Sequence, residues 1–442
     1  MTLNERYQNV AVIGAGGKMG SGISLLLAQE LTLRQLHPDN TGKKFRLILM
    51  DVSADALEGL KSYLAKQAER FVQKKGEKLA AAIPALATPD AAATFVAAMN
   101  GLLETTTDLK GLAGSTLVFE AILEKLDLKL KIYTELKEIC HPQAFFFTNT
   151  SSIPIKALDE GAHLDGRVIG FHFYNPPAVQ RLVELIIPEK VAAGLEEMSV
   201  QIGRDLGKII IPANDVAGFI GNGHFMRDGL HGMAAAQQLA GQRSLFQSIY
   251  MINRVSQEWL VRPMGIFQLI DYVGLDIFQS ILKIMEPYFP DENLHSELID
   301  RMVAAGVKGG QFSDGSQKNG FLKYEEGRIA GVYDLDGGKY RSLGSEDWRS
   351  EADHALGSLP AGYHSWKSLV KDPEAGEKLA AYFGKLVTNQ QPGAQLAKAY
   401  LERSKAIGEL LVSGGVARSA GDVNGVLMNG FFHLYGPVNN YV

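Results

Sequence analysis

The first half of the chain alternates short apolar, β-branched runs with longer segments in which apolar residues recur at helical spacing. This alternation is typical of a parallel sheet whose strands are joined by helices. Helical patterns lie between the apolar runs, the longest from Ala54 to about Lys75. The predicted strands cover Val10–Ile13, Arg46–Met50, Thr116–Phe119, Ala144–Thr148, Arg167–Phe171, Leu182–Ile186 and Lys208–Ile211.

The strand pattern ends at Pro212–Val216, where we place a domain boundary. From Gly218 to about Leu282 the apolar spacing is helical, and it becomes helical again at Gln395–Val412. Between Gly327 and Pro392 the chain is rich in Gly, Pro, Asp and Ser with weak periodicity, which predicts that parts of this region form surface loops. The pattern therefore predicts an α/β domain over residues 1–214, an all-α domain over residues 215–326 and an extra C-terminal segment over residues 327–442.

The end of the chain resembles an earlier part of the helical region. Arg418–Val442 and Ser244–Gly274 each follow a long helical pattern and carry a polar turn, an amphipathic helix, a glycine and an aromatic-rich stretch. This similarity predicts a degenerate, partial second repeat of the helical domain. Two unrelated helix–turn–helix pieces are the alternative.

Composition narrows the class of protein. A chain of 442 residues is too long for one compact core and suggests two or three domains. Its content of 46% hydrophobic and 21% charged residues is ordinary for a globular enzyme. The net charge of -5 gives no reason to expect nucleic acid or an acidic membrane as partner. The single cysteine, Cys140, excludes an intramolecular disulfide, and neither a secretory signal nor a membrane span is visible. We therefore expect a cytoplasmic protein.

A glycine-rich turn joins the first predicted strand to the first helical pattern. The strand runs directly into Gly14-Ala15-Gly16-Gly17-Lys18-Met19-Gly20. Glycines allow a tight turn and let a pyrophosphate approach the backbone at a helix N-terminus. The spacing is one residue longer than usual, and it leaves open which glycine packs against the helix. The turn predicts a Rossmann-type dinucleotide-binding domain, with a turn that binds no ligand as the alternative. The expected cofactor contacts are Gly14, Gly16, Gly17, Met19 and Gly20.

Asp51 directly follows the second predicted strand, later than the roughly 20 positions usual for the ribose-binding carboxylate. The polar stretch LTLRQLHPDNTGKKF looks like an insertion that explains the delay. A carboxylate here would accept hydrogen bonds from the ribose hydroxyls and repel a 2′-phosphate. Asp51 therefore favours NAD over NADP.

The stretch Arg167–Ile186 carries the strongest candidates for catalysis. A strand ends in His172, a turn contains Asn175, and Glu184 lies in the apolar run LVELII. A His at the carboxyl edge of a parallel strand faces the crevice where ligands bind, and a carboxylate on a neighbouring strand can hold one imidazole nitrogen. Glu184 in an apolar run requires a partner. The pair predicts an acid–base site.

A second polar cluster follows the apolar strand at Ala144–Thr148. Asn149, Ser151 and Ser152 are expected at the same sheet edge as His172. Ligand binding is one interpretation, and capping of the next helix is the other.

Together these motifs resemble the L-3-hydroxyacyl-coenzyme A dehydrogenase family over roughly Asn9–Tyr324. The resemblance is carried by VAVIGAGGKMGSGI, LVFEAILEKLDLK, TNTSSIPI, GFHFYNPP with LVELI, DVAGFIGN, RPMGIFQLIDYVGLD and NGFLKY. It implies an NAD-dependent enzyme of fatty acid β-oxidation type that interconverts 3-hydroxyacyl and 3-oxoacyl thioesters. No metal is implied.

The resemblance also implies residue roles. His172 is then the general base, Glu184 its orienting partner, and Ser151 and Asn222 hold the reacting oxygen. In this family a Ser and a Lys on the helix after the acidic strand hold coenzyme A; here the Ser position is Gln67, while Lys74 fits the Lys position. The further residues implied to contact the cofactor are Glu120, Lys125, Asn149 and Asn175.

Two other functions stay open. One is a related dehydrogenase of a free hydroxy acid or sugar acid, of the gulonate or carnitine type, which shares the cofactor fold and the His–Glu pair but lacks the coenzyme A contacts. The other is a nucleotide-binding structural or sensor protein that has lost catalysis.

The family resemblance gives the C-terminal repeat a meaning. Family members dimerise through the helical domain, and longer relatives place a second copy where a partner subunit would sit. We therefore expect Gln395–Val442 to pack on the first helical domain of the same chain, giving a monomer with an internal pseudo-dimer in preference to a homodimer. The residues expected to be largely buried there are Phe431, Phe432, Leu434 and Tyr435.

Overall fold

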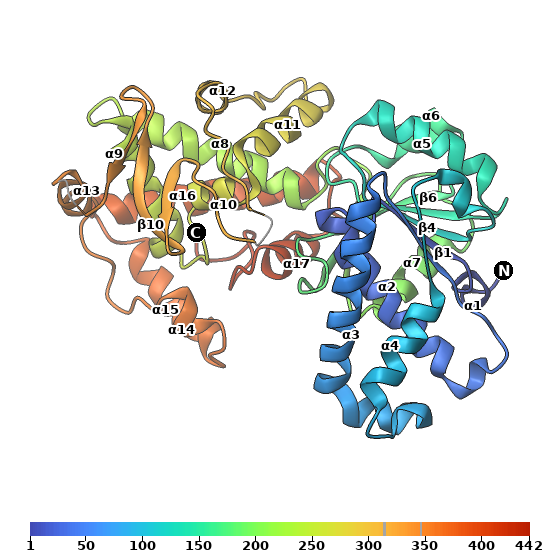
Figure 1. The fold of residues 1–442 in the computed structure, drawn as a ribbon. Helices are drawn as coiled ribbons and strands as arrows, with labels where there is room; N and C mark the ends of the chain where they lie inside the picture. The colour runs from blue at the N-terminus through green and yellow to red at the C-terminus, as the bar shows by residue number, and fades with distance from the viewer. Residues whose placement is uncertain (313–314, 345–346) are drawn as a thin grey trace. The chain divides into compact units, whose positions relative to one another are not determined.

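The computed structural model describes residues 1–312, 315–344 and 347–442. The chain forms two compact units, Met1–Asp215 (unit 1) and Val216–Val442 (unit 2) (Figure 1). Unit 1 is an α/β layer structure, and unit 2 is mainly helical.

Unit 1 is built on an eight-stranded sheet of order β3-β2-β1-β4-β5-β6-β7-β8. All seven strands predicted from the apolar runs are present. The additional strand, β3, has the sequence Leu-Glu-Thr-Thr and lies at the sheet edge, where polar residues reach solvent and leave no apolar run. The strands are β1 (Val10–Ile13), β2 (Leu47–Met50), β3 (Leu103–Thr106), β4 (Leu117–Glu120), β5 (Phe145–Thr148), β6 (Val168–Phe173), β7 (Leu182–Ile187) and β8 (Ile209–Asn214).

The sheet is parallel from β3 through β6, but β7 runs antiparallel to β6. This corrects the expectation of a wholly parallel sheet. The short segment between Phe173 and Leu182 contains no helix, and a connection of that length can only reverse the chain. β8 then pairs in parallel with β7.

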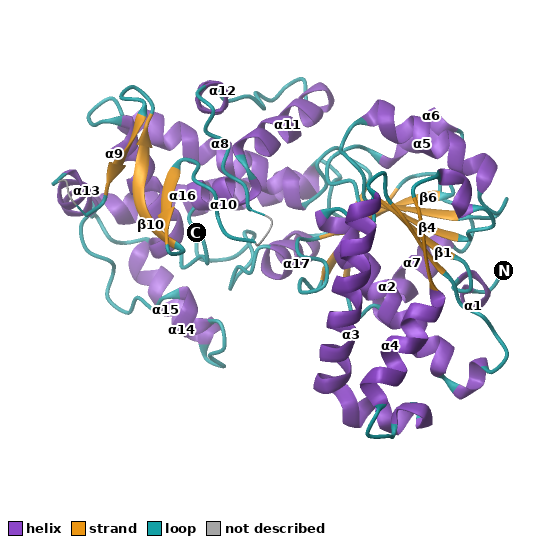
Figure 2. Ribbon diagram, in the orientation of Figure 1, coloured by secondary structure: helices purple, strands orange, loops and turns teal. Residues whose placement is uncertain are grey.

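Helices cover both faces of the unit 1 sheet, with α5 and α6 on one face and α2, α3 and α4 on the other (Figure 2). This explains why β1, β2, β4 and β5 are buried along their whole length. Two helices are longer than expected: α3 continues to Ala82, and α2 takes up the first part of the supposed insertion. The helices are α1 (Leu3–Arg6), α2 (Lys18–Leu36), α3 (Ala54–Ala82), α4 (Ala91–Leu102), α5 (Leu126–Ile139), α6 (Ile155–Ala162) and α7 (Leu195–Asp205).

Unit 2 begins with helices α8 to α12 and ends with α13 to α17. Between these groups lies an antiparallel sheet of order β11-β10-β9, which the sequence did not predict. Its strands are β9 (Leu322–Glu325), β10 (Arg328–Asp334) and β11 (Lys339–Ser342). The helices are α8 (Gly221–Leu239), α9 (Leu245–Arg254), α10 (Ile266–Val273), α11 (Leu275–Met285), α12 (Glu297–Ala304), α13 (Trp348–Leu356), α14 (Trp366–Leu369), α15 (Ala375–Leu386), α16 (Pro392–Ser413) and α17 (Ala420–Gly430).

Between Gly327 and Pro392, where loops are expected over parts of the chain, the structure has β10, β11 and α13 to α15 with irregular connections between them. Each of these elements is short, so its periodicity is weak. They are stabilised by packing: Val332 of β10, Trp348 of α13 and Phe383 of α15 are all buried in the unit 2 core. Tertiary contacts therefore decide their structure.

The C-terminal segment packs on the first helices of the same unit, as expected. α16 lies along α8, the Tyr400 hydroxyl donates to the Asp228 carbonyl over 3.0 Å, and the Tyr435 hydroxyl donates to the Leu260 carbonyl over 2.7 Å. Of the four residues expected to be buried, Tyr435 is buried and Phe431 and Leu434 are partly buried. Phe432 is 49% exposed, so that expectation is wrong. It follows the end of α17, where its carbonyl accepts a bond from the Trp366 indole.

Candidate active site

The glycine turn after β1 packs backbone against backbone. Gly14 has φ +74°, and a Cβ there would lie 2.5 Å from the Ala121 carbonyl oxygen. A Cβ on Gly20 would lie 1.9 Å from the Gly14 carbonyl oxygen. Gly20 is therefore the glycine that lets the first turn of α2 approach the loop, which the spacing alone left open. Gly22 instead faces Pro177, where a Cβ would lie 2.9 Å from Cδ.

The same turn fits a dinucleotide. The N-cap of α2, Gly17, provides no side-chain bond to the helix N-terminus, so the backbone N–H groups there suit a pyrophosphate. Asp51 follows β2 and is half-buried, and its Oδ2 accepts from the Gly16 amide over 2.9 Å. The carboxylate that is expected to bind the ribose is thus fixed beside the turn. Met19 lies partly buried against the core of unit 1.

Glu120, at the end of β4, is completely buried. Its carboxylate accepts from the Lys129 ammonium over 2.7 Å, the Tyr133 hydroxyl over 3.1 Å and the Thr148 hydroxyl over 2.7 Å. The Ile122 amide donates a further bond over 2.8 Å. The protein itself therefore satisfies this carboxylate, and a cofactor contact by Glu120 stays a prediction.

Three further residues of unit 1 that are expected to contact the cofactor or the substrate lie at the start of α5, on α3 and in the turn after β6. Lys125 is the exposed N-cap of α5, and Lys74 is exposed on α3. Asn175 is half-buried in the turn after β6.

The polar loop after β5 lies beside the end of β6. The Asn149 Oδ1 accepts from the Phe173 amide over 2.8 Å, which places the loop next to the residue that follows His172. Ser152 is buried and Ser151 is half-buried. The capping alternative is wrong, because the first amides of α6 donate to the Asp215 carboxylate and no loop side chain caps that helix.

His172 and Glu184 face each other directly across the antiparallel pair β6 and β7. The His172 Nδ1 lies 3.4 Å from the Glu184 Oε2. Glu184 is completely buried and His172 is 8% exposed. The structure thus brings the two residues together, while their catalytic roles stay predictions.

Tyr174 joins this pair, and sequence reasoning assigned it no role. Its hydroxyl donates to the Glu184 Oε2 over 3.0 Å, and burial together with the Glu184 carboxylate raises the pKa of Tyr174. Its ring lies 4.8 Å from the His172 ring, centroid to centroid. The signal in the sequence was its position two residues after His172, because alternate residues of an extended segment lie on the same side. Tyr174 directly follows the last residue of β6.

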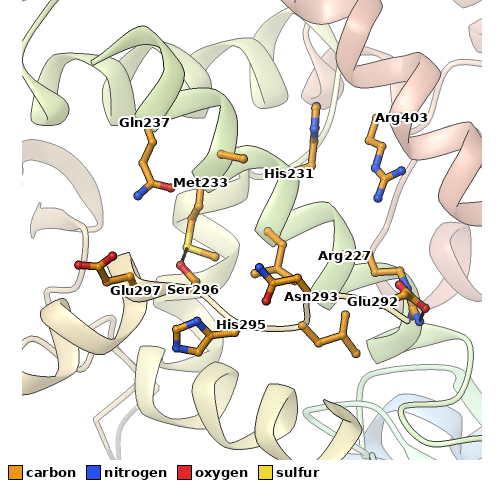
Figure 3. A pocket seen from close by; sticks show the side chains of 13 residues that line it. Arg227, His231, Met233, Gln237, Glu292, Asn293, His295, Ser296, Glu297 and Arg403 are labelled. Carbon is orange, nitrogen blue, oxygen red and sulfur yellow. Dashed lines mark hydrogen bonds and ion pairs between the residues drawn. The ribbon is translucent and has the colours of Figure 1, made fainter. Parts of the chain in front are cut away.

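Asn222 is the second residue of α8, in unit 2, and is half-buried. Unit 2 also contains a cavity of about 760 Å³ lined by α8, the segment before α12 and Arg403 of α16 (Figure 3). Its charges are partly paired, since Arg227 bonds Glu292 over 2.6 Å. His231, which lines the cavity, is nine residues beyond Asn222 on α8, about two and a half turns, and so points from the opposite face. Asn222 is not among the residues that line this cavity.

Two kinds of feature are absent from the part of the chain that the structure describes. No group of three or more His, Cys, Asp and Glu side chains is arranged to hold a metal ion. No helix there has the length and apolar character needed to cross a membrane.

Two family models match the chain. The model described as the NAD binding domain of 3-hydroxyacyl-CoA dehydrogenase matches residues 9–216, and the model of the C-terminal domain of the same enzyme matches residues 232–323.

Individual relatives agree with these models. A probable 3-hydroxybutyryl-CoA dehydrogenase of Deinococcus radiodurans is 28% identical over 308 residues, which are 70% of this chain and 98% of the relative. A peroxisomal fatty acid beta-oxidation multifunctional protein of Oryza sativa is 28% identical over 73% of this chain, and the match spans only 39% of that longer protein. The crystal structure of 3-hydroxybutyryl-CoA dehydrogenase from Escherichia coli has a TM-score of 0.64 and covers 98% of this chain and 90% of that chain. At 21% identity it shows a shared fold that includes the C-terminal segment.

Proposed function

Because the chain belongs to the 3-hydroxyacyl-CoA dehydrogenase family and is thus an NAD-dependent oxidoreductase, we propose that it interconverts 3-hydroxyacyl-CoA and 3-oxoacyl-CoA thioesters. The observation that carries this proposal is the His172–Glu184 pair. It lies at the carboxyl ends of the parallel strands, where the glycine turn and Asp51 also lie. The residues proposed for acid–base catalysis and those proposed to bind the cofactor therefore all belong to unit 1.

The glycine turn and Asp51 would hold NAD, which would supply the acceptor for the hydride on the hydroxyl-bearing carbon of the substrate. His172 takes the hydroxyl proton, and Glu184 stabilises the resulting imidazolium. Since Nδ1 faces Glu184 over 3.4 Å, we assign the proton exchange with substrate to the other ring nitrogen, Nε2. Tyr174 donates to the same Glu184 oxygen and so fixes the carboxylate that orients the ring. Ser151 holds the substrate oxygen on which charge develops.

The proposal that the substrate is a thioester is supported by the relatives and by the family resemblance. The Deinococcus relative is named for a CoA thioester, and it aligns over most of both chains. Lys74 is exposed on α3 and can reach an anionic coenzyme A group, but Gln67 replaces the family's Ser. This replacement is the observation that keeps a free hydroxy acid as the second candidate substrate.

The test follows NADH oxidation with acetoacetyl-CoA and with free acetoacetate. We expect rapid oxidation with the thioester and at least 100-fold slower oxidation with the free acid, on the order of what lost binding energy from the coenzyme A part costs in turnover. The reverse preference would assign the chain to the free-acid dehydrogenases. Oxidation with neither would overturn the proposed function.

A second experiment replaces His172, the proposed general base. His172→Gln should lower kcat by about 10²- to 10⁴-fold while the NADH Kd changes by less than about threefold, since general acid–base catalysis contributes on that order. Glu184→Gln should also lower kcat and change its pH profile. The matched control is His354→Gln, an exposed histidine on α13, which should leave both quantities unchanged. A His172→Gln variant that keeps most of its activity would refute the role of His172.

A further inference from the structure

One carboxylate joins the loops that follow β4 and β5. The Glu124 Oε1, in the loop after β4, accepts from the Thr150 hydroxyl over 2.5 Å and from the backbone amides of Ser151 over 3.0 Å and Ser152 over 3.2 Å. The Ser152 hydroxyl donates a fourth bond over 3.1 Å. A single oxygen therefore fixes three consecutive residues of the loop that carries Ser151.

The other oxygen of Glu124 is held by a buried cation. The Lys129 Nζ lies 3.3 Å from the Glu124 Oε2 and 2.7 Å from the Glu120 Oε1. The Lys129 side chain is 1% exposed, whereas that of Glu124 is 27% exposed. Burial acts to lower the pKa of Lys129, but the two carboxylates outweigh it and raise the pKa, so the lysine stays charged. Lys129 thus anchors Glu124 to the end of β4.

The electrostatics of Glu124 follow from the same contacts. Burial acts to raise its pKa, but the Lys129 ammonium and the hydrogen bonds of the loop outweigh burial, so the pKa lies below its usual value. The carboxylate is therefore ionised at neutral pH, and charge-assisted hydrogen bonds to it are stronger than neutral ones.

The loop is also fixed at its other end. The Asn149 Oδ1 accepts from the Phe173 amide over 2.8 Å, directly after His172. The loop that carries Ser151 is therefore hydrogen-bonded to β6 through Asn149 and to the loop after β4 through Glu124. Both neighbours of Ser151, Thr150 and Ser152, are buried, which leaves the loop little freedom.

We propose that Glu124, anchored by Lys129, is a positioning residue that fixes the backbone of Ser151 so that its hydroxyl is held in place for the reacting oxygen of the substrate. This rests on the proposed function only in assigning Ser151 to the substrate. The bonds to Thr150, Ser151 and Ser152 are independent of that assignment. Misplacing a substrate-positioning group by about 1 Å costs about 10²-fold in rate.

The test variant is Glu124→Gln, which keeps one carbonyl oxygen for the loop but places an amide group against the Lys129 ammonium. Its matched control is Glu160→Gln, an exposed glutamate on α6, the helix that follows this loop. Two readouts are measured on the full chain: amide hydrogen exchange at Ser151 and Ser152, and kcat for acetoacetyl-CoA per NADH-binding site.

We expect amide exchange at Ser151 and Ser152 to rise at least about tenfold in Glu124→Gln. kcat per site should fall by about 10²-fold, with KM and the NADH Kd changed less than about threefold. Glu160→Gln should change none of these. Faster exchange with an unchanged kcat per site would show a merely structural role, and unchanged exchange would show that Glu124 does not hold the loop. Either result overturns the proposal.

Should Glu124→Gln fail to fold, Ser152→Ala removes the hydroxyl donor to Glu124 and leaves the Ser151 amide in place. It should raise exchange and lower kcat in the same pattern, by about threefold each, and no change in either quantity would count against the proposal. If the wild-type chain oxidises NADH with neither substrate, the proposed function fails, and the exchange rates alone then decide whether Glu124 fixes the loop.

Discussion

Each unit buries a cation against carboxylates, and the two clusters have different neighbours. In unit 1, Lys129 bridges Glu120 and Glu124, one at the end of β4 and one in the loop after it. In unit 2, Arg262 pairs with Asp228 of α8 over 2.9 Å, and both side chains are 5% exposed. The Arg262 guanidinium also donates to the Ser404 hydroxyl of α16 over 3.0 Å.

The cluster of unit 1 reaches the loop that carries Ser151, and one of its members is partly open to solvent. The cluster of unit 2 lies between the first helices and the C-terminal segment, where the Tyr400 hydroxyl also bonds the Asp228 carbonyl. A buried ion pair of this kind gives orientation more than net stability. We infer that the same chemistry orients a loop for substrate in unit 1 and fixes the packing of two helical segments in unit 2.

The largest effect is expected from removing the C-terminal segment. Truncation before Gln395 deletes Ala397, Tyr400, Leu401 and Tyr435 from the core of unit 2 and exposes the apolar face of α8 that they cover. We expect aggregation or new self-association, because a large exposed apolar patch is unstable in water. Size-exclusion chromatography with light scattering, run beside the full chain at equal concentration, measures this. A soluble, fully active truncated monomer would contradict the role of the segment in packing.

The second effect concerns the ion pair of unit 2. Arg262→Met leaves Asp228 buried without its cation, which should lower the free energy of unfolding by about 3–5 kcal/mol. Denaturant unfolding measures the change, and Arg349→Met, an exposed arginine on α13, is the control. The double variant Asp228→Leu/Arg262→Met should recover much of the loss, because no unpaired charge stays buried. If the single variant is as stable as wild type, the cluster does not hold the two segments together.

The pH dependence of this loss has a defined sign. In the wild type, burial acts to raise the pKa of Asp228, but Arg262 together with His224, His231 and His433 outweighs burial and holds the pKa below its usual value. Asp228 therefore contributes stability above about pH 4, which is lost as the pH falls. Without Arg262, burial raises the Asp228 pKa above its unfolded value. The difference between variant and wild type should then be largest at neutral pH and shrink toward about pH 4.

The sequence predicted the sheet of unit 1 because its strands are apolar runs buried on both faces. Glu184 was visible for the same reason, as one charge in an apolar run that required a partner. Lys129 and Glu124 were not visible, because a lysine on an amphipathic helix is usually solvated and the bonds of Glu124 join two loops 26 positions apart. The sheet of unit 2 was missed because β9 and β11 are four residues long and mostly polar.

The smallest effect is expected from Asp51, at the carboxyl end of β2 in unit 1. This carboxylate should contribute to cofactor binding and contribute little to the stability of the fold. Asp51 is half-buried, and its two oxygens accept from the Gly16 and Ser53 amides. Asp51→Ala should weaken NADH binding by about 1–3 kcal/mol, the scale of hydrogen bonds lost to a charged acceptor, and reduce discrimination against NADPH. Titration calorimetry with both cofactors measures this, with Asp55→Ala, an exposed carboxylate in the first turn of α3, as control. The melting temperature should change little, in contrast to Arg262→Met. Equal use of both cofactors by the wild type, or an unchanged NADH Kd in Asp51→Ala, would show that Asp51 does not bind the ribose, and the sheet edge would then lack the carboxylate that selects NAD.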